Sequence, residues 1–302
     1  MVIGNFDGVH PGHRAVLAEA RRREPGLPLV VVTFWPHPVG VLRPDASPML
    51  LTSLKGRIEL LQQAGASRVE VIDFTREFAD WSPRRFVEEI LVPLTPALLV
   101  VGENFRFGKD AAGGVDALRE LAAGRFGVDA LPLVRYEDEE TCSTLIREAL
   151  RAGDVRRAGE HLGRPFRFRG HVVSGDRRGH ALGFPTANLP VPANRACPAD
   201  GVYAGWVWRR DLPGAQRWPA AISVGTNPTF DGVQRRVEAH VLGRDDLDLY
   251  GVPIMVEFTD RIRGQIRFAG PDALVAQLRE DVASCRGLLG VPDGGGGRPG
   301  GA

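Results

Sequence analysis

The sequence GNFDGVHPGH, at residues 4–13, marks the passage from a strand to a helix. It follows the apolar pair Val2-Ile3, which is typical of a strand end, and it precedes residues 14–23, whose spacing is helical. Its three glycines let the backbone approach a ligand closely, and Pro11 suits the first turn of a helix. A helix that begins at the carboxyl edge of a parallel sheet presents free N–H groups to an anion. The stretch therefore predicts an anion-binding turn.

Apolar runs of strand length alternate with helical patterns through the first half of the chain. The expected strands are Leu29–Phe34, Val69–Phe74, Leu98–Val101 and Ala130–Val134. The expected helices are residues 53–64, a helix capped by Ser82 with Pro83 at its first position, and residues 117–123. Short buried strands that alternate with helices indicate a parallel sheet covered on both faces. We expect a Rossmann-like α/β domain over residues 1–158.

The second half has the pattern of an antiparallel β-barrel or sandwich, with short strands separated by turns. The expected strands are Phe166–Val173, Val202–Trp208, Ala220–Val224, Arg236–Leu242 and Val252–Phe258. One helix, Pro271–Leu289, closes this domain, which we place at residues 159–290. Residues 291–302 are mostly glycine and are expected to be a disordered tail.

The composition is that of an ordinary protein of two domains. The chain has 302 residues, and its 38 basic and 37 acidic side chains give a net charge of +1. This balance argues against a nucleic-acid coat. No apolar run reaches the ~18 residues of a membrane span, and the start lacks a secretory signal. The three cysteines are widely spaced, so we expect a reducing, cytoplasmic location. From the charge balance and the lack of a long apolar run, we expect no nucleic-acid or membrane partner.

The first strand is short, because only three residues precede Gly4. Strands in such sheets typically have ~5–6 residues. We therefore expect that residues upstream of Met1 complete this strand in the natural protein, although a short strand is the plainer interpretation.

His10 and His13 are the candidate catalytic residues of the first domain. Two imidazoles three residues apart on one helical turn can donate hydrogen bonds to phosphate oxygens as charge builds up in a transition state. The alternatives are a structural glycine-rich turn and a metal site. The metal alternative lacks nearby acidic or thiol ligands at suitable spacing. We therefore prefer the hypothesis of phosphate binding.

A second candidate phosphate site is the sequence TCSTLIR at residues 141–147. Ser143 and Thr144 supply hydroxyls and Arg147 a cation on the first turn of a helix. A plain N-cap is the common alternative. Together the two turns resemble the HxGH nucleotidylyltransferase superfamily, whose members join a nucleotide α-phosphate to an acceptor and release pyrophosphate.

Two loops that follow expected strands are rich in aromatic residues, at residues 33–38 and 101–108. Asn104, Phe105 and Phe107 lie in the second loop, and such groups at one sheet edge could receive a flat heteroaromatic ring. Core packing explains the two phenylalanines equally well.

The second domain contains a candidate site for magnesium and phosphate at residues 175–189. Pro185 forces the residue before it into an extended shape, so Thr186 and Asn188 share one face of an extended chain. A hydroxyl and an amide oxygen beside a glycine-rich loop can hold Mg²⁺ together with ATP phosphates.

Glu238 is the candidate general base of the second domain. On an expected strand, Val237 and Ala239 point to one side, and Glu238 points to the other. A carboxylate there could take a proton from a substrate hydroxyl. The alternative is a surface salt bridge with Arg236.

Over residues 1 to about 290, the chain resembles the bacterial bifunctional riboflavin kinase/FAD synthetase family. The matching stretches are residues 4–13, 33–38, 101–108, 143–147, 175–189, 201–206, 221–230, 236–242 and 248–251. The resemblance implies a six-stranded type of barrel that transfers the ATP γ-phosphate to riboflavin, which gives FMN. It also implies an N-terminal domain that adenylylates FMN, which gives FAD and pyrophosphate. ATP is then the co-substrate, and the protein is expected to be a monomer or a weak homo-oligomer.

The resemblance implies roles for individual residues. His10 and His13 stabilise the attacked phosphate, Glu238 is the base, and Thr186 and Asn188 hold Mg²⁺ with ATP. The nucleotide-binding candidates are Gly4, Phe6, Asp7, Gly8, Gly12, Ser143, Thr144, Arg147, Gly175, Gly179 and Gly183. The flavin-binding candidates are Asn104, Phe105, Phe107, Phe184 and Arg263.

Two residues depart from the family pattern: Cys142 stands where a serine is common, and Gln265 where an acidic residue is common. Neither departure removes a residue assigned to chemistry. The alternatives that stay open are a protein with one of the two activities, a non-catalytic flavin or nucleotide sensor, and a cytidylyltransferase acting on a small alcohol. The last leaves the barrel unexplained.

Overall fold

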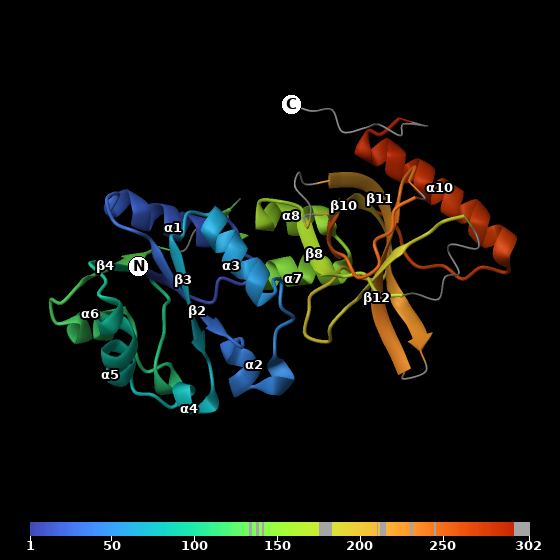
Figure 1. The fold of residues 1–302 in the computed structure, drawn as a ribbon. Coiled ribbons are helices and arrows are strands. Elements are labelled where there is room, and N and C mark those ends of the chain that lie inside the picture. The colour runs from blue at the N-terminus through green and yellow to red at the C-terminus, as the bar shows by residue number, and fades with distance from the viewer. Residues whose placement is uncertain are drawn as a thin grey trace. The chain divides into compact units, whose positions relative to one another are not determined.

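The computed structural model describes residues 1–132, 135–136, 139–140, 142–174, 183–209, 211, 216–229, 232–244 and 246–292. The chain divides into two compact units (Figure 1). The first unit is Met1–Ser143 with Asn194–Ala196, and the second is Thr144–Ala193 with Cys197–Ala302. The expected boundary between residues 158 and 159 stays a prediction. Residues 293–302 of the expected tail lie outside the described residues.

A five-stranded parallel sheet forms the centre of the first unit, in the strand order β3-β2-β1-β4-β5. Its strands are β1 (Val2–Ile3), β2 (Val30–Trp35), β3 (Arg68–Asp73), β4 (Leu98–Gly102) and β5 (Gly127–Leu131). The expected parallel α/β sheet is confirmed. Because β1 lies in the middle, the turn after Ile3 leaves the sheet at its centre, with strands on both sides.

Apolar side chains cover both faces of this sheet, as the run-like strands predicted. Val2, Val31 and Val100 pack on one face against Leu17 and Leu61. Their chain neighbours Ile3, Val32 and Val101 pack on the other face, in a cluster that also holds Phe86, Leu91 and Leu118. Neighbouring strand residues point to opposite faces. The sheet is therefore a layer between two apolar cores.

The helices that supply these cores follow the strands in alternation. They are α1 (Pro11–Arg23), α2 (Pro38–Leu42), α3 (Leu54–Gln63), α4 (Arg76–Ala79), α5 (Pro83–Phe86) and α6 (Val115–Ala122). Short η segments span Pro44–Ala46, Val87–Leu91, Val92–Leu94 and Lys109–Ala111, and two short strands, β6 (Arg135–Tyr136) and β7 (Glu139–Glu140), pair with each other. Ser82 accepts a hydrogen bond from the Arg85 N–H, which confirms the expected cap.

The strand expected at Ala130–Val134 is placed wrongly. β5 begins three residues earlier, at Gly127, which pairs with Leu98 at the start of β4. Pairing with the neighbouring strand sets where β5 begins, whereas the apolar pattern points to residues nearer its end. Residues 133 and 134 lie outside the described part of the chain.

A six-stranded antiparallel sheet forms most of the second unit, in the order β8-β13-β10-β11-β12-β9. The strands are β8 (Phe166–His171), β9 (Ala187–Pro190), β10 (Gly201–Arg209), β11 (Gln216–Thr229), β12 (Gly232–Val241) and β13 (Pro253–Arg263). The Val173 N–H donates to the Asn188 carbonyl at 2.9 Å, which joins the two ends of the sheet into a nearly closed barrel. The expected barrel is confirmed.

Helices accompany the barrel at both ends of its sequence. α7 (Ser143–Ala152) and α8 (Val155–Leu162) precede it, and α10 (Pro271–Leu289) follows it with the bounds predicted from the sequence. Cys285 of α10 is fully buried and packs against Ala204 and Leu242, so this helix covers one side of the barrel sheet (Figure 1).

Candidate active sites

The two histidines of the glycine-rich turn lie together at the start of α1. His10 is the N-cap residue of α1, and His13 is in its first turn. Their rings are stacked, with 3.6 Å between centroids and 24° between planes. Phe6, which is buried, packs edge-on against His13 at 5.1 Å. The structure thus brings both imidazoles to the helix N-terminus, where backbone N–H groups favour an anion.

The carboxylate of Asp7 is buried beneath this turn and is held by the protein itself. It accepts hydrogen bonds from the Leu51 and Thr52 N–H groups at 3.0 Å and from the Thr52 hydroxyl at 2.9 Å. Arg57, also buried, forms an ion pair with it at 3.3 Å. The nucleotide contact expected of Asp7 stays a prediction, and the observed contacts are structural.

Sequence reasoning missed Arg57. The spacing could have predicted that Arg57 is buried, because it lies four residues before the core residue Leu61 and so shares the same face of α3. An arginine at a core position of a helix requires an acidic partner. That partner, Asp7, is 50 residues away in the sequence.

Ser143 joins the second predicted phosphate segment to the turn, since its hydroxyl donates to the Asp7 carbonyl at 2.9 Å. Thr144 and Arg147 follow on the first turns of α7. The structure gives Gly4 and Gly12 at either end of the turn, and Gly8 has a φ of 87°. The nucleotide contacts of these residues stay predictions.

A cavity of about 610 Å³ lies at the carboxyl ends of β1, β2 and β4. Asn104, Phe105 and Phe107 line it, as the loop sequence suggested. Phe34, which belongs to the expected aromatic loop at residues 33–38, lines it as well. Phe74, Phe78 and Trp81, which were not predicted, complete the aromatic part of the lining. Phe107 is also buried in the sheet core and stacks on Phe105 at 5.5 Å, so core packing applies to this residue, and its contact with a flat ring stays a prediction. The lining suits a flat aromatic ligand.

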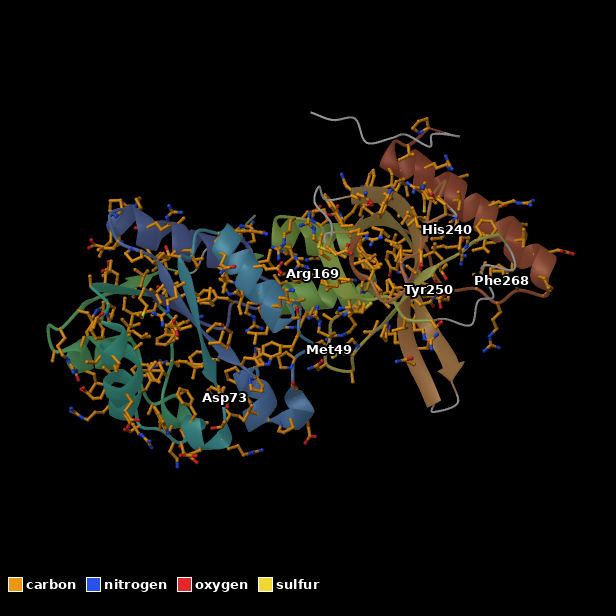
Figure 2. The ribbon with its side chains drawn as sticks, viewed as in Figure 1. Met49, Asp73, Arg169, His240, Tyr250 and Phe268 are labelled. Atoms are coloured by element: carbon orange, nitrogen blue, oxygen red, sulfur yellow. The ribbon has the colours of Figure 1, made fainter. Side chains whose placement is uncertain are left out.

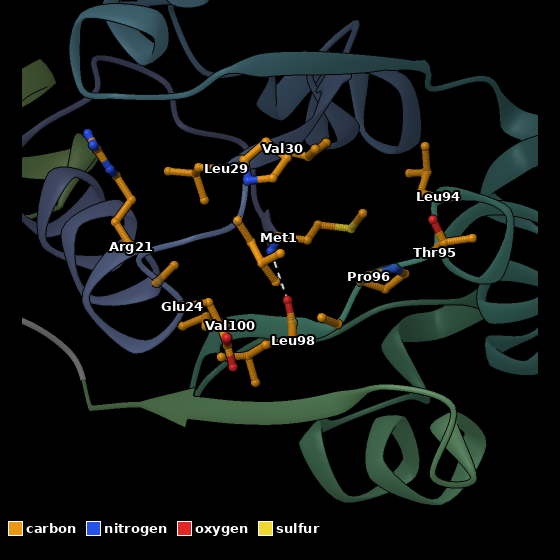
Figure 3. Close-up of a pocket in the computed structure, with 14 residues that line it drawn as sticks. Met1, Arg21, Glu24, Leu29, Val30, Leu94, Thr95, Pro96, Leu98 and Val100 are labelled. Carbon is orange, nitrogen blue, oxygen red and sulfur yellow. Dashed lines mark hydrogen bonds between the residues drawn. The ribbon is translucent and has the colours of Figure 1, made fainter.

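A different pocket, of about 290 Å³, lies at the opposite edge of the same sheet (Figure 3). Its lining includes the starts of β2 and β4 and the Met1 ammonium group, which donates to the Leu98 carbonyl at 2.8 Å. Burial lowers the pKa of this amino group. None of the motifs found in the sequence falls in this pocket.

In the barrel, the candidate base and the candidate metal ligand are direct neighbours across two strands. Glu238 of β12 is paired with Asn188 of β9 on one side and with Ser223 of β11 on the other. The Asn188 amide nitrogen donates to the Thr186 carbonyl at 3.1 Å and to its hydroxyl at 3.3 Å. These bonds turn the amide oxygen away from Thr186. Val237 and Ala239 are buried, so Glu238 points away from the barrel core, as predicted.

His240 is a residue of this site that sequence reasoning did not select. Its Nδ1 lies 2.9 Å from the Pro185 carbonyl, and its ring packs edge-on against Phe184 at 5.3 Å. Figure 2 shows it on the barrel. Burial lowers the pKa of His240. The imidazole therefore holds the segment that leads into Thr186, and its alternation with Glu238 on β12 was the available signal.

The remaining barrel candidates have other contacts or lie outside the described residues. Arg263, a predicted flavin contact, forms a two-point ion pair with Asp281 of α10 at 2.8 and 2.6 Å. Gln265 donates to the Ser223 hydroxyl and the Val224 carbonyl. Gly183 has a φ of 82°, which suits glycine. Gly175 and Gly179 lie outside the described residues, and the flavin role of Phe184 and Arg263 stays a prediction.

None of the helices that the structure describes combines the length and the apolar character needed to cross a membrane.

Comparison with known proteins assigns the chain to a family. Sequence profiles match for FAD synthetase over residues 1–145 and for riboflavin kinase over residues 162–289. The bifunctional riboflavin kinase/FMN adenylyltransferase of Escherichia coli strain K12 is 36% identical, over 96% of this chain and 93% of that protein. The protein of that name from Bacillus subtilis strain 168 is 33% identical, over 93% of this chain and 89% of its own length.

A crystal structure described as a macrolide-efflux protein from Streptococcus pneumoniae has the same fold, with a TM-score of 0.82 at 34% identity. It is matched over 94% of this chain and 93% of that one. Both profiles and the relatives of nearly equal length lead to one conclusion: the chain belongs to the family of bifunctional riboflavin kinase/FMN adenylyltransferases.

Proposed function

We propose that this chain makes FAD from riboflavin in two ATP-dependent steps, one in each unit, with the residues named above. The observation that carries the proposal is the stacked pair His10 and His13 at the N-terminus of α1, in the same unit as the aromatic cavity of about 610 Å³. A phosphate-binding helix start and a cavity for a flat ring are the two parts that adenylylation of a flavin nucleotide requires.

In the first unit, the FMN phosphate attacks the α-phosphate of ATP and pyrophosphate leaves. His10 and His13 donate hydrogen bonds to the α-phosphate oxygens, which carry more charge in the transition state than in the ground state. The backbone N–H groups at the start of α1 add to this stabilisation. Asn104, Phe105 and Phe107 hold the isoalloxazine ring in the cavity that they line.

In the second unit, the riboflavin 5′-hydroxyl attacks the γ-phosphate of ATP, which forms FMN, and ADP leaves. Glu238 accepts the hydroxyl proton, and it is well placed for this because it is the cross-strand neighbour of Asn188. Thr186 and Asn188 supply a hydroxyl and an amide oxygen, which are hard ligands of the kind that Mg²⁺ takes together with phosphate oxygens. The two residue types therefore fit the ion, which would neutralise phosphate charge when bound. Binding would require the Asn188 amide, whose nitrogen donates to the Thr186 hydroxyl, to turn its oxygen toward the ion.

The expected partners are riboflavin, FMN and ATP, and we place the enzyme in the cytoplasm as a monomer or a weak homo-oligomer. Free thiols at Cys142, Cys197 and Cys285 fit a reducing compartment.

The test is incubation of the full chain with riboflavin, ATP and Mg²⁺, followed by chromatography of the flavins over time. FMN should rise first and FAD should follow, with pyrophosphate released in the second step only. CTP in place of ATP is the control for the cytidylyltransferase alternative. Formation of FMN without FAD would show that the chain has the kinase activity alone. Binding of flavin without any product would favour the alternative of a non-catalytic sensor.

A further inference from the structure

The turn that carries His10 and His13 has an uncommon backbone. Phe6 has a φ of 50° and Val9 a φ of 44°, on either side of Asp7 and Gly8. Positive φ is rare for residues other than glycine, and it is a true outlier for a β-branched residue such as valine. Such conformations persist only where the surrounding structure holds them in place.

Asp7, in the middle of this turn, is the residue through which neighbouring segments hold the turn in this conformation. Its side chain is 2% exposed and is contacted by the Leu51 N–H, by the Thr52 N–H and hydroxyl, and by Arg57. The Thr52 hydroxyl in turn accepts from the Gly8 N–H at 3.4 Å. The turn and residues 51–52 are thus joined by bonds in both directions.

Arg57 completes this arrangement from the first turn of α3. It is fully buried, and a buried carboxylate such as that of Asp7 is costly unless a cation compensates it. One guanidinium nitrogen lies 3.3 Å from Asp7, and another donates to the Phe34 carbonyl, also at 3.3 Å. The guanidinium carbon lies 5.4 Å from the centre of the Trp35 ring. The planar group therefore spans the histidine turn and the end of β2.

We propose that Arg57 is a positioning residue for adenylyl transfer. With one nitrogen it holds Asp7, and so the turn that presents His10 and His13. With the other it holds Phe34, which lines the flavin cavity. A single side chain thereby sets the phosphate-binding turn at a fixed distance from the flavin site. This inference rests on the function proposed for the first unit.

The experiment compares three variants of the full chain in both reactions. Arg57→Met removes both contacts at similar length, and Arg57→Lys keeps the charge but has one nitrogen. Arg125→Met is the matched control, because Arg125 pairs with Glu88 on the surface of the same unit. For each we would measure kcat and KM for FMN and ATP, the rate of riboflavin phosphorylation, and thermal unfolding.

Arg57→Met should lower the kcat of adenylyl transfer ~10²-fold, the scale for a small misplacement of reacting groups, while both KM values change little. Arg57→Lys should recover part of this loss, and riboflavin phosphorylation should stay normal in all three. A folded Arg57→Met protein with normal adenylyl transfer would overturn the proposal. If Arg57→Met does not fold, a normal kcat in Arg57→Lys overturns it, and a reduced kcat at normal KM supports it. Failure of the unmodified chain to adenylylate FMN would instead refute the proposed function.

Discussion

The imidazole rings of His10 and His13 are stacked at a centroid distance of 3.6 Å, and the edge of His13 also meets the buried ring of Phe6. Packing against the core therefore holds the two imidazole rings together, and a substitution at one histidine changes the packing of the other. In the proposed reaction they act together on one phosphate, so removal of one should cost most of what the pair contributes.

His13→Ala should slow adenylyl transfer by ~10²-fold or more, because that is the scale for losing one preorganised donor to a developing charge. Riboflavin phosphorylation should be unchanged, since its candidate residues lie in the second unit. The measurement is the rate of each step, with FMN supplied directly for the second. His171→Ala, at an exposed histidine of β8, is the control. A folded variant that loses both activities would contradict the assignment.

Glu238→Gln should lower riboflavin phosphorylation by ~10²- to 10⁴-fold, the usual share of a general base. Glutamine keeps the size and the hydrogen bonding of the side chain but cannot take the hydroxyl proton. Adenylylation of supplied FMN should continue at its normal rate. Glu280→Gln, on the exposed side of α10, controls for loss of a carboxylate. Near-normal kinase turnover in Glu238→Gln would return Glu238 to the role of a salt-bridge partner.

Thr186→Val should raise the Mg²⁺ concentration that half-saturates the kinase by at least ~10-fold, the scale seen when even an outer partner of a metal site is lost. Valine keeps the shape of threonine but removes the hydroxyl oxygen. Titration of both reactions with Mg²⁺ in the presence of ATP measures the effect, and the adenylyl transfer curve serves as the internal control. An unchanged kinase curve would exclude the hydroxyl as a ligand.

The barrel should lose stability in alkali. Burial raises the pKa of Tyr203 to about 12, and burial together with nearby Asp281 raises the pKa of Cys285 to about 12. In the unfolded chain these groups lose their protons at ~10 and ~8.5. The folded state holds the protons more tightly, so its advantage is complete below pH ~8.5 and declines as the pH rises toward 12. Urea midpoints at pH 8, 10 and 11 measure this decline.

Tyr203→Phe and Cys285→Ala should both flatten that decline, since neither replacement titrates. The Tyr203 hydroxyl donates to the Ala199 carbonyl at 2.6 Å, so its variant will also start from a lower stability at pH 8. Variants whose midpoints fall as steeply as those of the unmodified chain would show that other groups cause the alkaline loss.

His240 predicts the opposite behaviour in acid. Burial lowers its pKa, so the unfolded chain takes up the proton first, near pH ~6.5. The contribution of the neutral ring to stability is therefore complete above that pH and is lost as the pH falls through the lower pKa of the folded state. An NMR titration of His240 should give a midpoint below 6.5, and His240→Asn should reduce the acid loss of stability. A midpoint above 6.5 would contradict the burial argument.

Local patterns in the sequence predict many of the helices and strands of this fold. Continuous apolar runs such as Val30–Trp35 and Leu98–Gly102 are buried on both faces, and the cap at Ser82 and the full length of α10 follow from residue types alone. Strand order was not predictable in this way. The strand order places β1 between β2 and β4, which are far apart in the chain. This order depends on which helices pack on which face of the sheet, and no local pattern specifies that.

The residues of the candidate sites likewise include some that local patterns predict and some that they do not. His10, His13, Asn188 and Glu238 lie within motifs, and the structure brings Asn188 and Glu238 side by side although 50 positions separate their numbers. Arg57 and the aromatic residues from Phe74 to Trp81 lie outside any motif. They belong to the sites through contacts between distant segments, so a pattern along the chain indicates at most that they are buried.

The bridge between Val173 and Asn188 has a consequence for how the chain behaves while it folds. Strands β8 and β9 are the two ends of the six-stranded sheet, and each would otherwise offer a row of free N–H and C=O groups to a strand from another molecule. By joining the chain just after β8 to β9, the bridge pairs some of these groups and shortens the open edge that another strand could use. The bridge runs through the backbone of the same asparagine whose side chain is the candidate magnesium ligand, so the barrel closes beside the candidate kinase residues.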